Sequence, residues 1–491
     1  SEAVARGAAA AATAASFREA TWKPNARISE ARQSGRERQL KRPKGRSYRE
    51  RSSAEVHSGI SEARKMSIKS KTASGPALEP FGDPYTFCEP CWYQGFPSPY
   101  YRESHVQFRK TVRDFVEKEM KPIVDDLISK KQLYPVELHE KAYKAGIQGI
   151  LYPKEYGGTR PDDFDAFHEL ILWDELARCG GGVLGQMSIN SMALPPIIGF
   201  ASENVKNKVI RDVVTGKKNC SLMISEPWAG SDVASIRTTA EKVGDHYIVN
   251  GQKKWITGSL IADYWTCLVR TGGEGAGGLS ILLLEKSMPG ITIRKMETQF
   301  DNTHNTCAVE LDDVKVPLEN LIGVEGMGFA YITLNFNHER FVIAAGTARQ
   351  ARICYQESLH EAMTRKTFGK KLISHQLIRF KLAEMARQIE ALQDHLERIA
   401  YQFSNGVPDS ALGAQCALLK VQATKTFEYC AREASQIFGG SSIVKEGRGK
   451  LVERLYREVR GVAIPGGSEE ILLDFAIRSA EREGQKAKAK L

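Results

Sequence analysis

The chain has 491 residues, of which 42% are hydrophobic and 26% charged, a composition typical of a globular protein with roughly two to four compact units. Its net charge of +10 lies at the N-terminal end, because residues 1–65 carry 15 Lys/Arg and 7 Asp/Glu, whereas the remainder carries 54 and 52. The nearly neutral remainder argues against nucleic-acid binding, and the lack of an apolar run of about eighteen residues argues against a membrane span.

Residues 1–80 are rich in Ala, Ser, Arg and Gly and show no periodic apolar pattern. We therefore predict a disordered basic extension, because such a composition buries too little apolar surface to offset the ordering entropy. An Arg-, Ala- and Ser-rich start suggests a transit peptide, but seven acidic residues in 1–65 argue against one. The first methionine is Met66, and we expect the natural chain to begin there.

Residues 81–103 are dense in Pro, Gly and aromatic residues, which predicts an irregular covering segment. Cys88 and Cys91 form a C-x-x-C pair here without a second pair or a nearby histidine. A loop with two thiols is therefore favoured over a zinc or redox site, and no metal site is predicted. The nine cysteines of the chain are scattered, which favours free thiols in a reducing compartment.

From residue 104 to 219 the apolar residues recur at helical spacing, which predicts an N-terminal helical domain. The predicted helices are 106–128, 135–145, 162–178 and 204–215. From 220 to 322 short strands separated by turns predict a middle β domain, either a sandwich or a small barrel. Within it, 273–278 fits G-x-G-x-x-G, but it lies between two strands, so a strand connection is favoured over a dinucleotide site.

The helical period returns from 323 to 482 and predicts a C-terminal antiparallel bundle, followed by a polar tail at 483–491. The expected segments are 326–365, 373–404, 409–438, 446–460 and 467–482. The predicted fold is therefore mainly α with a central β domain.

Glu339 lies on the apolar stripe of the first bundle helix, between Phe336 and Ile343. A carboxyl group facing apolar neighbours is expected to have a raised pKa, which suits a general base near neutral pH. On the helix alone, a core glutamate paired with Arg340 or Lys381 is the stronger interpretation.

Four segments in order, ISEPWAGSD at 224–232, WIT at 255–257, RKTFG at 365–369 and QIFGG at 436–440, resemble the acyl-CoA dehydrogenase family. The resemblance extends from about residue 104 to 480 and implies a flavoenzyme that contains FAD. It implies contacts to the flavin ring and ribityl chain from Leu222, Ile224, Ser225, Gly230, Ser231, Trp255, Ile256 and Thr257, with Trp255 beside the ring and Thr257 near N5. Without the resemblance, a core aromatic would be the favoured interpretation of Trp255.

The resemblance also assigns Arg365 and Thr367 to the FAD pyrophosphate, where a cation and a hydroxyl suit phosphate oxygens. On its own, a solvated basic helix end would explain them equally well. The remaining implied FAD contacts are Phe368, His375, Gln376, Gln436, Gly439, Gly440, Ser468 and Glu470. In the family, the arginine and the 436–440 segment come from a neighbouring subunit, which implies a homo-oligomer, a dimer of dimers.

Many family members carry their catalytic glutamate where this chain has Gly466. A minority, including isovaleryl-CoA and long-chain types, place it on the helix before an arginine, as in Glu339-Arg340. The resemblance therefore implies that Glu339 removes the α proton of an acyl-CoA while hydride passes to flavin N5, giving a trans-2-enoyl-CoA. The Gly466 N–H would polarise the thioester carbonyl. Glu469 and Glu470 are nearby rivals, and Ser231, Asn337, Arg340 and Gly467 are the implied substrate contacts.

Three questions stay open at this stage. The acceptor is either electron-transfer flavoprotein or oxygen. A peroxisomal address is favoured over the mitochondrial matrix because the sequence given ends in Ala489-Lys490-Leu491, a variant of Ser-Lys-Leu. The alternatives to a dehydrogenase are an oxidase or nitroalkane-type relative, disfavoured by Gly466, and a flavin-bound nucleic-acid-binding relative, disfavoured by the neutral charge.

Overall fold

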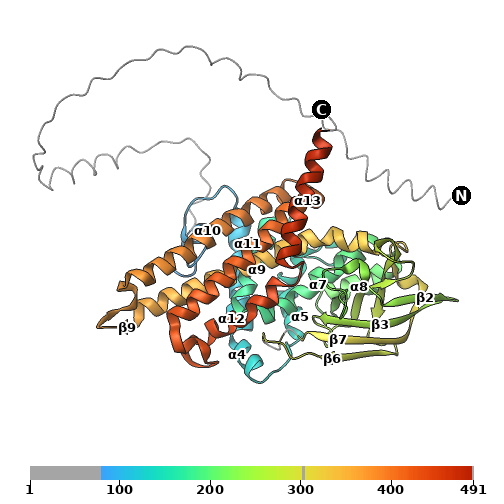
Figure 1. The fold of residues 1–491 in the computed structure, drawn as a ribbon, viewed down its shortest axis with the longest axis horizontal. Coiled ribbons are helices and arrows are strands. Elements are labelled where there is room, and N and C mark those ends of the chain that lie inside the picture. Colours follow the sequence, from blue (N-terminus) through green and yellow to red (C-terminus); the bar gives the residue numbers. More distant parts are fainter. Residues whose placement is uncertain (1–78, 301–302, 304, 489–491) are drawn as a thin grey trace, which may run out of the picture. The chain divides into compact units, whose positions relative to one another are not determined.

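The structure is a computed structural model and describes residues 79–300, 303 and 305–488 (Figure 1). The chain divides into two units, Ser1–Thr72 and Ala73–Leu491, and the described residues all belong to the second. The predictions for the basic extension before residue 79, for Met66 as the start and for the terminal tripeptide fall outside the described residues and stay predictions. Among the described residues, no helix combines the length and the apolar character that crossing a membrane requires.

The N-terminal domain is helical, as its amphipathic pattern predicts. Its elements are α3 (Glu103–Phe115), a π-helical turn (Val116–Met120), α4 (Lys121–Ser129), α5 (Glu137–Lys144), α6 (Ala166–Leu176), α7 (Gly181–Phe200) and α8 (Glu203–Val214). The sequence does not predict α7, because this helix is apolar on every side and contains Pro195 and Pro196, so it has no polar stripe to reveal a period. Its second half is nevertheless buried, and it packs between the β domain and α9.

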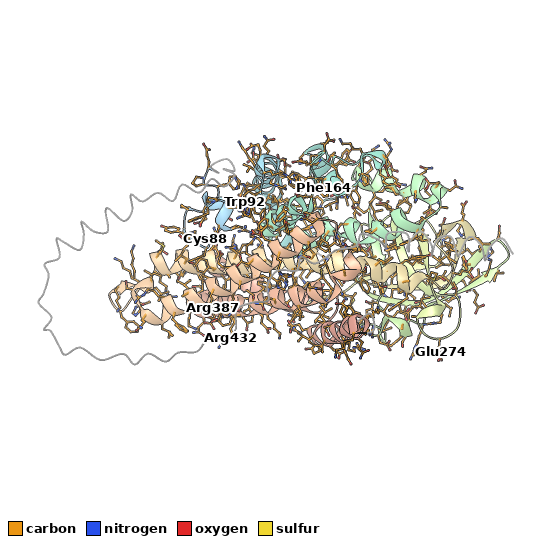
Figure 2. The ribbon with its side chains drawn as sticks, turned by 90° about the horizontal axis from the view of Figure 1, so that it is seen from above. Cys88, Trp92, Phe164, Glu274, Arg387 and Arg432 are labelled. Carbon is orange, nitrogen blue, oxygen red and sulfur yellow. The ribbon has the colours of Figure 1, made fainter. Side chains whose placement is uncertain are left out.

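The predicted covering segment is irregular except for a short 3-10 helix at Cys91–Gln94. Its aromatic residues surround Arg109 of α3, whose guanidinium lies 4.1 Å from the ring centre of Phe81 and 4.6 Å from those of Trp92 and Tyr93. Such cation–π contacts fix the segment on the helical domain. All nine cysteines are free, including buried Cys88 and exposed Cys91, and Figure 2 shows Cys88 and Trp92 beside the same stretch of ribbon.

The middle domain contains one eight-stranded sheet in the order β6-β7-β3-β2-β4-β5-β8, with β1 paired to β4. The strands are β1 (Cys220–Met223), β2 (Thr239–Val243), β3 (His246–Ile256), β4 (Tyr264–Arg270), β5 (Leu279–Glu285), β6 (Ile291–Lys295), β7 (Cys307–Pro317) and β8 (Leu321–Ile322). Strands β2 and β4 share a single pair, Thr239 with Arg270, so the sheet bends there. Tyr247, Trp265 and Leu282 from the two halves meet in one core, which is the sandwich-like option of the prediction.

The strands that the sequence misses are the short ones, β1, β2 and β8. The G-x-G-x-x-G stretch forms the connection between β4 and β5, as predicted, with a 3-10 turn at Ala276–Gly278. Figure 2 places Glu274 of this connection at the periphery, away from Arg387 and Arg432 of the bundle. Helices α7 and α8 cover the outer face of β4 and β5.

The C-terminal bundle follows the predicted segments closely. It contains α9 (Gly328–Thr364), α10 (Gln376–Ser404), α11 (Gly413–Phe438), α12 (Lys450–Ala463) and α13 (Glu469–Lys488), with a hairpin of β9 (Lys366–Thr367) and β10 (Lys370–Lys371) between α9 and α10. Helix α11 packs against α9, α10, α12 and α13. The hairpin lies at the end of the bundle remote from β2, β3 and β7 (Figure 1).

Candidate active site

Glu339 of α9 is buried, with 7% of its surface exposed, as its place on the apolar stripe predicts. Burial raises its pKa to about 7, because the carboxylate loses its hydration. The Asn335 amide lies one turn earlier and donates a hydrogen bond of 2.8 Å to the carboxyl oxygen. This hydrogen bond favours the ionised form and so lowers the pKa, against the larger effect of burial. A carboxyl group with this pKa can accept a proton near neutral pH.

The ion pairs that offered the competing explanation of Glu339 do not form among the described residues. Lys381 pairs with Glu433. Arg340 donates from Nε to the Gly466 carbonyl at 3.2 Å and from Nη1 to the Asn337 amide oxygen at 2.9 Å. The Glu339 carboxyl is therefore free of a direct cationic partner, which is the arrangement that a base needs.

His338 provides a charge beside the base that the sequence does not predict. It forms an ion pair of 2.9 Å with Glu169 of α6. Burial works against its charge, but the carboxylate of Glu169 raises its pKa to about 9, so the imidazole is protonated at neutral pH. This positive charge favours the ionised form of Glu339.

Helix α7 connects Glu339 with the strand end that carries Thr257. The Asn335 amide that holds Glu339 also donates to the Met192 carbonyl of α7 at 3.3 Å. One turn earlier on α7, Ile189 contacts Gly258, where a Cβ would lie 2.7 Å from the Ile189 Cδ1. The predicted base and the predicted N5 neighbour thus lie against the same stretch of α7.

The turn after α12 approaches the same part of α9. Gly466 has a φ of +71° and its Cα faces Ile343, one turn after Glu339, where a Cβ would lie 2.7 Å from the Ile343 Cδ1. A side chain at this position would be strained by the positive φ and would clash with Ile343, so glycine suits it. The structure therefore places Gly466 against the stretch of α9 that carries Glu339, next to Arg340 and Ile343.

The two rival carboxylates have other surroundings. Glu469 accepts a hydrogen bond of 2.8 Å from the Thr424 hydroxyl and pairs with Lys425 at 3.1 Å. Glu470 is exposed at the start of α13, where the Ser468 hydroxyl and backbone hydrogen bonds lower its pKa. Glu470 with its lowered pKa is therefore a poor base near neutral pH, and the carboxylate of Glu469 is engaged by Thr424 and Lys425.

The predicted flavin-ring contacts gather at the ends of β1 and β3. The Ser221 hydroxyl donates to the Thr257 carbonyl, and the Lys254 N–H donates to the Ser225 carbonyl at 2.9 Å. Trp255 is 48% exposed although large, and its backbone is held at a φ of +63°. Ile224 and Ile256 are buried and Leu222 is half-buried, whereas Gly230 and Ser231 are exposed.

A buried ion pair that the sequence does not reveal supports this surface. Lys253, fully buried, pairs with Glu226 at 3.0 Å and donates to the Ile224 carbonyl at 2.9 Å. Glu226 in turn accepts hydrogen bonds from the N–H groups of Arg237 and Thr238. An exposed indole beside a rigid, glycine-containing turn fits a flat aromatic ligand such as a flavin.

The predicted pyrophosphate contacts form a separate group at the remote end of the bundle. Arg365 Nη1 donates to the Phe438 carbonyl at 3.0 Å, next to Gly439, and Thr367 Oγ1 lies 3.1 Å from His375 Nε2. Phe368 is 95% exposed. Gln376 opens α10, and Gln436 and Gly440 are exposed at the end of α11. Within one chain, β9 of this group lies at the opposite end of the structure from β3, the strand that carries Trp255 (Figure 1).

The two predicted substrate contacts on α9 have hydrogen-bond partners within the chain. Asn337 is buried, and its amide donates to the Asp409 carbonyl at 2.8 Å while its oxygen accepts from Arg340. Arg340 is buried against the Gly466 turn and the ring of Phe475. Both therefore support the turn, and their contacts with substrate stay predictions. Ser231, Gly467 and Ser468 stay predictions.

Comparison with protein families gives three matches in chain order. The N-terminal domain of acyl-CoA dehydrogenase matches residues 102–217, its middle domain 221–314 and its C-terminal domain 326–480. Among curated proteins, the chain is 40% identical over 418 residues to "Acyl-CoA dehydrogenase apdG" of Emericella nidulans, covering 80% of this chain and 94% of that protein.

Solved structures agree. A probable acyl-CoA dehydrogenase from Mycobacterium abscessus aligns with a TM-score of 0.73 at 33% identity, over 78% of this chain and all of that one. An acyl-CoA dehydrogenase from Bacillus anthracis in complex with FAD aligns with a TM-score of 0.74 at 27% identity, over 80% of this chain and 69% of that one.

Proposed function

Because the chain belongs to the acyl-CoA dehydrogenase family, we propose that it catalyses the FAD-dependent α,β-dehydrogenation of an acyl-CoA thioester with Glu339 as the base. The observation that carries the role of Glu339 is its environment. The carboxyl group is buried, has no direct cationic partner among the residues that the structure describes, has a pKa of about 7 and lies on the part of α9 that contacts the Gly466 turn.

FAD, when bound, supplies the acceptor for the hydride that leaves the β carbon. Ser225, Trp255 and Thr257 would hold its ring, in agreement with the exposed indole and the rigid turn beside it. Glu339 accepts the α proton of the acyl group, and the product is a trans-2-enoyl-CoA. The Gly466 N–H acidifies the α carbon by donating to the thioester carbonyl. Burial of Glu339 keeps water away from the proton transfer.

The role of Glu339 can be tested by anaerobic titration of the flavoprotein with a panel of acyl-CoA thioesters. In Glu339→Gln we expect FAD to stay bound and its reduction by acyl-CoA to fall by at least about 10³-fold. Glu357→Gln is the matched control, because Glu357 is on the same helix, also has a pKa raised by burial and lies near His360, away from the site. Near-normal reduction in Glu339→Gln would remove Glu339 from the mechanism.

The same titration identifies the acyl class and the acceptor. The most rapidly reducing thioester identifies the preferred chain length and branching. Admission of air to the reduced enzyme then separates the two acceptors. Reoxidation within seconds supports the oxidase alternative, whereas slow reoxidation that electron-transfer flavoprotein accelerates supports a dehydrogenase.

A complete FAD site would need a second copy of the chain, because β9, which directly follows Arg365, and β3, which carries Trp255, lie at different ends of one chain (Figure 1). Large apolar side chains near the first group are exposed and available for such a contact: Phe368, Leu377, Phe380 and Ile443. We expect a homodimer in which Arg365 of one copy binds the pyrophosphate of the FAD that Trp255 of the other holds, with two dimers forming a tetramer.

Coexpression of two inactive variants tests this arrangement. Glu339→Gln lacks the base and Arg365→Met lacks the phosphate contact. In a mixed dimer with a shared site, one of the two sites has both residues intact, so activity returns in proportion to the mixed dimers. If Arg365 served the FAD of its own chain, no mixed dimer would contain an intact site and no activity would return.

A further inference from the structure

The turn at 464–467, which carries Gly466 between α12 and α13, is held by two buried cations. Lys420 of α11 donates from Nζ to the carbonyl of Ala463 and, at 2.9 Å, to that of Gly467. Arg340 donates to the intervening Gly466 carbonyl at 3.2 Å. The turn contains two glycines in succession, with φ values of +71° and +98°, and such a pair has wide conformational freedom of its own. Its shape therefore depends on contacts from outside the turn.

Lys420 is an unusual residue for this position. It is fully buried, and among the described residues its ammonium group forms no salt bridge. The nearby carboxylate of Glu469 is occupied by Lys425 and the Thr424 hydroxyl. A buried ammonium group is costly unless hydrogen bonds compensate it, and here the compensating groups are carbonyls of the turn. The charge of Lys420 is thus directed at the turn.

We propose that Lys420 is a positioning residue that fixes the 464–467 turn, so that the Gly466 N–H meets the thioester carbonyl. This inference rests on the proposed function of the site. Carbonyls that accept from a cation are fixed more firmly than by a neutral donor, and because those of Ala463 and Gly467 flank Gly466, the direction of its N–H is fixed with them. A nearby positive charge also favours the negative charge that develops on the thioester oxygen.

The test compares Lys420→Met with Lys425→Met. The two substitutions remove the same charge from the same helix, but Lys425 is exposed and does not contact the turn. The spectroscopic measurement is the infrared carbonyl stretch of trans-2-enoyl-CoA, labelled with ¹³C at the thioester and bound to the oxidised holoenzyme. In Lys420→Met we expect this stretch to move toward that of the free ligand and the rate of flavin reduction to fall about 10-fold, with enoyl-CoA affinity within about twofold. In Lys425→Met all three should match the wild type.

The pH dependence of the infrared carbonyl stretch gives an independent test of the role of Lys420. Burial lowers the pKa of Lys420 to about 8. The charged groups that face it are Arg340 of α9, Arg460 of α12 and Glu469 and Glu470 of α13. As the pH rises through about 8 the ammonium group loses its charge, so the stretch in the wild type should move toward the free value, whereas in Lys420→Met it should stay constant.

Each result of these measurements either supports or overturns the positioning role of Lys420. A stretch and a reduction rate in Lys420→Met equal to the wild type would overturn the positioning role. If Lys420→Met does not fold, Lys420→Gln, which keeps a donor without the charge, is compared by the same measurements, and an unchanged stretch in that variant would overturn the role too. Failure of the wild-type enzyme to be reduced by any acyl-CoA would refute the proposed function itself, which is a different result.

Discussion

Replacement of the proposed base by glutamine should stabilise the protein, and the gain should grow as the pH rises from about 4.5 to 7. Glu339 keeps its proton up to a pH of about 7 in the folded state, whereas an unperturbed glutamate ionises near 4.5. Between these values the unfolded chain releases a proton that the folded chain retains, so folding stability falls as the pH rises and the full cost applies above pH 7. A shift of this size corresponds to about 3 kcal/mol at pH 8 and about 1 kcal/mol at pH 5.

Glutamine has the shape of the protonated carboxyl group, and its side-chain oxygen can still accept from Asn335. In Glu339→Gln the pH-dependent cost is therefore removed without a cavity. We expect the variant to exceed the wild type in free energy of unfolding by about 3 kcal/mol at pH 8, and by about 1 kcal/mol or less at pH 5.

Urea denaturation of both proteins at the two pH values measures this difference, with equal m-values showing that the unfolded states match. Glu428→Gln is the control, because Glu428 is exposed on α11. A stability difference that is the same at pH 5 and pH 8 would refute the reasoning, since it would show that the carboxyl group does not titrate with a raised pKa.

Three further predictions follow from the same contacts. The rate constant for flavin reduction at low substrate should rise about tenfold per pH unit below pH 7 and level off above it, as stopped-flow absorbance from pH 5 to 8 can show, because only ionised Glu339 accepts a proton. Asn335→Leu removes the donor to that carboxylate, so in the same assay this rising limb should move to higher pH by about one unit, and an unmoved limb would contradict the role of the amide. Lys253→Met leaves Glu226 buried and unpaired, so urea denaturation should show a loss of about 3–5 kcal/mol, which Glu226→Gln in the same chain should largely restore.

The parts of the fold that the sequence predicts are those with a strong period. Helices α10 and α11 are long and pack with one face in the bundle, and α9, which is buried all round from Ala344 to Tyr355, has an apolar stripe in its first turns, so the ends of all three are predicted to within a few residues. Helix α7 is missed although it is 20 residues long, because it is buried on most sides and its sequence has no polar face. Strands β1 and β8 contain four and two residues, too few to show an alternation.

The residues of the site divide in the same way, into those recognisable from a local pattern and those that depend on partners distant in the sequence. Glu339 is recognisable because a carboxylate interrupts an apolar stripe, a pattern contained within one helix. The sequence does not reveal the roles of Lys420, Asn335 and Lys253. Each of these side chains acquires its role from a carbonyl or carboxylate that is distant in the sequence. The same limit applies to the partners that Arg340 and Asn337 have within the chain, the Gly466 turn and Asp409, while their contacts with substrate stay predictions.

A single chain does not bring Glu339 and the predicted pyrophosphate contacts together, which favours a site shared by two chains. Arg365 and Thr367 follow directly after α9, the same helix that carries Glu339, yet a helix of 37 residues rises about 1.5 Å per residue and so separates its two ends by about 55 Å. Glu339 lies near the first end and Arg365 beyond the last, about 26 residues or 39 Å apart along the axis. One extended FAD molecule would have to span most of that length within a single chain. A second copy that places its own hairpin near Trp255 removes this requirement, and its exposed Phe368 would then be buried.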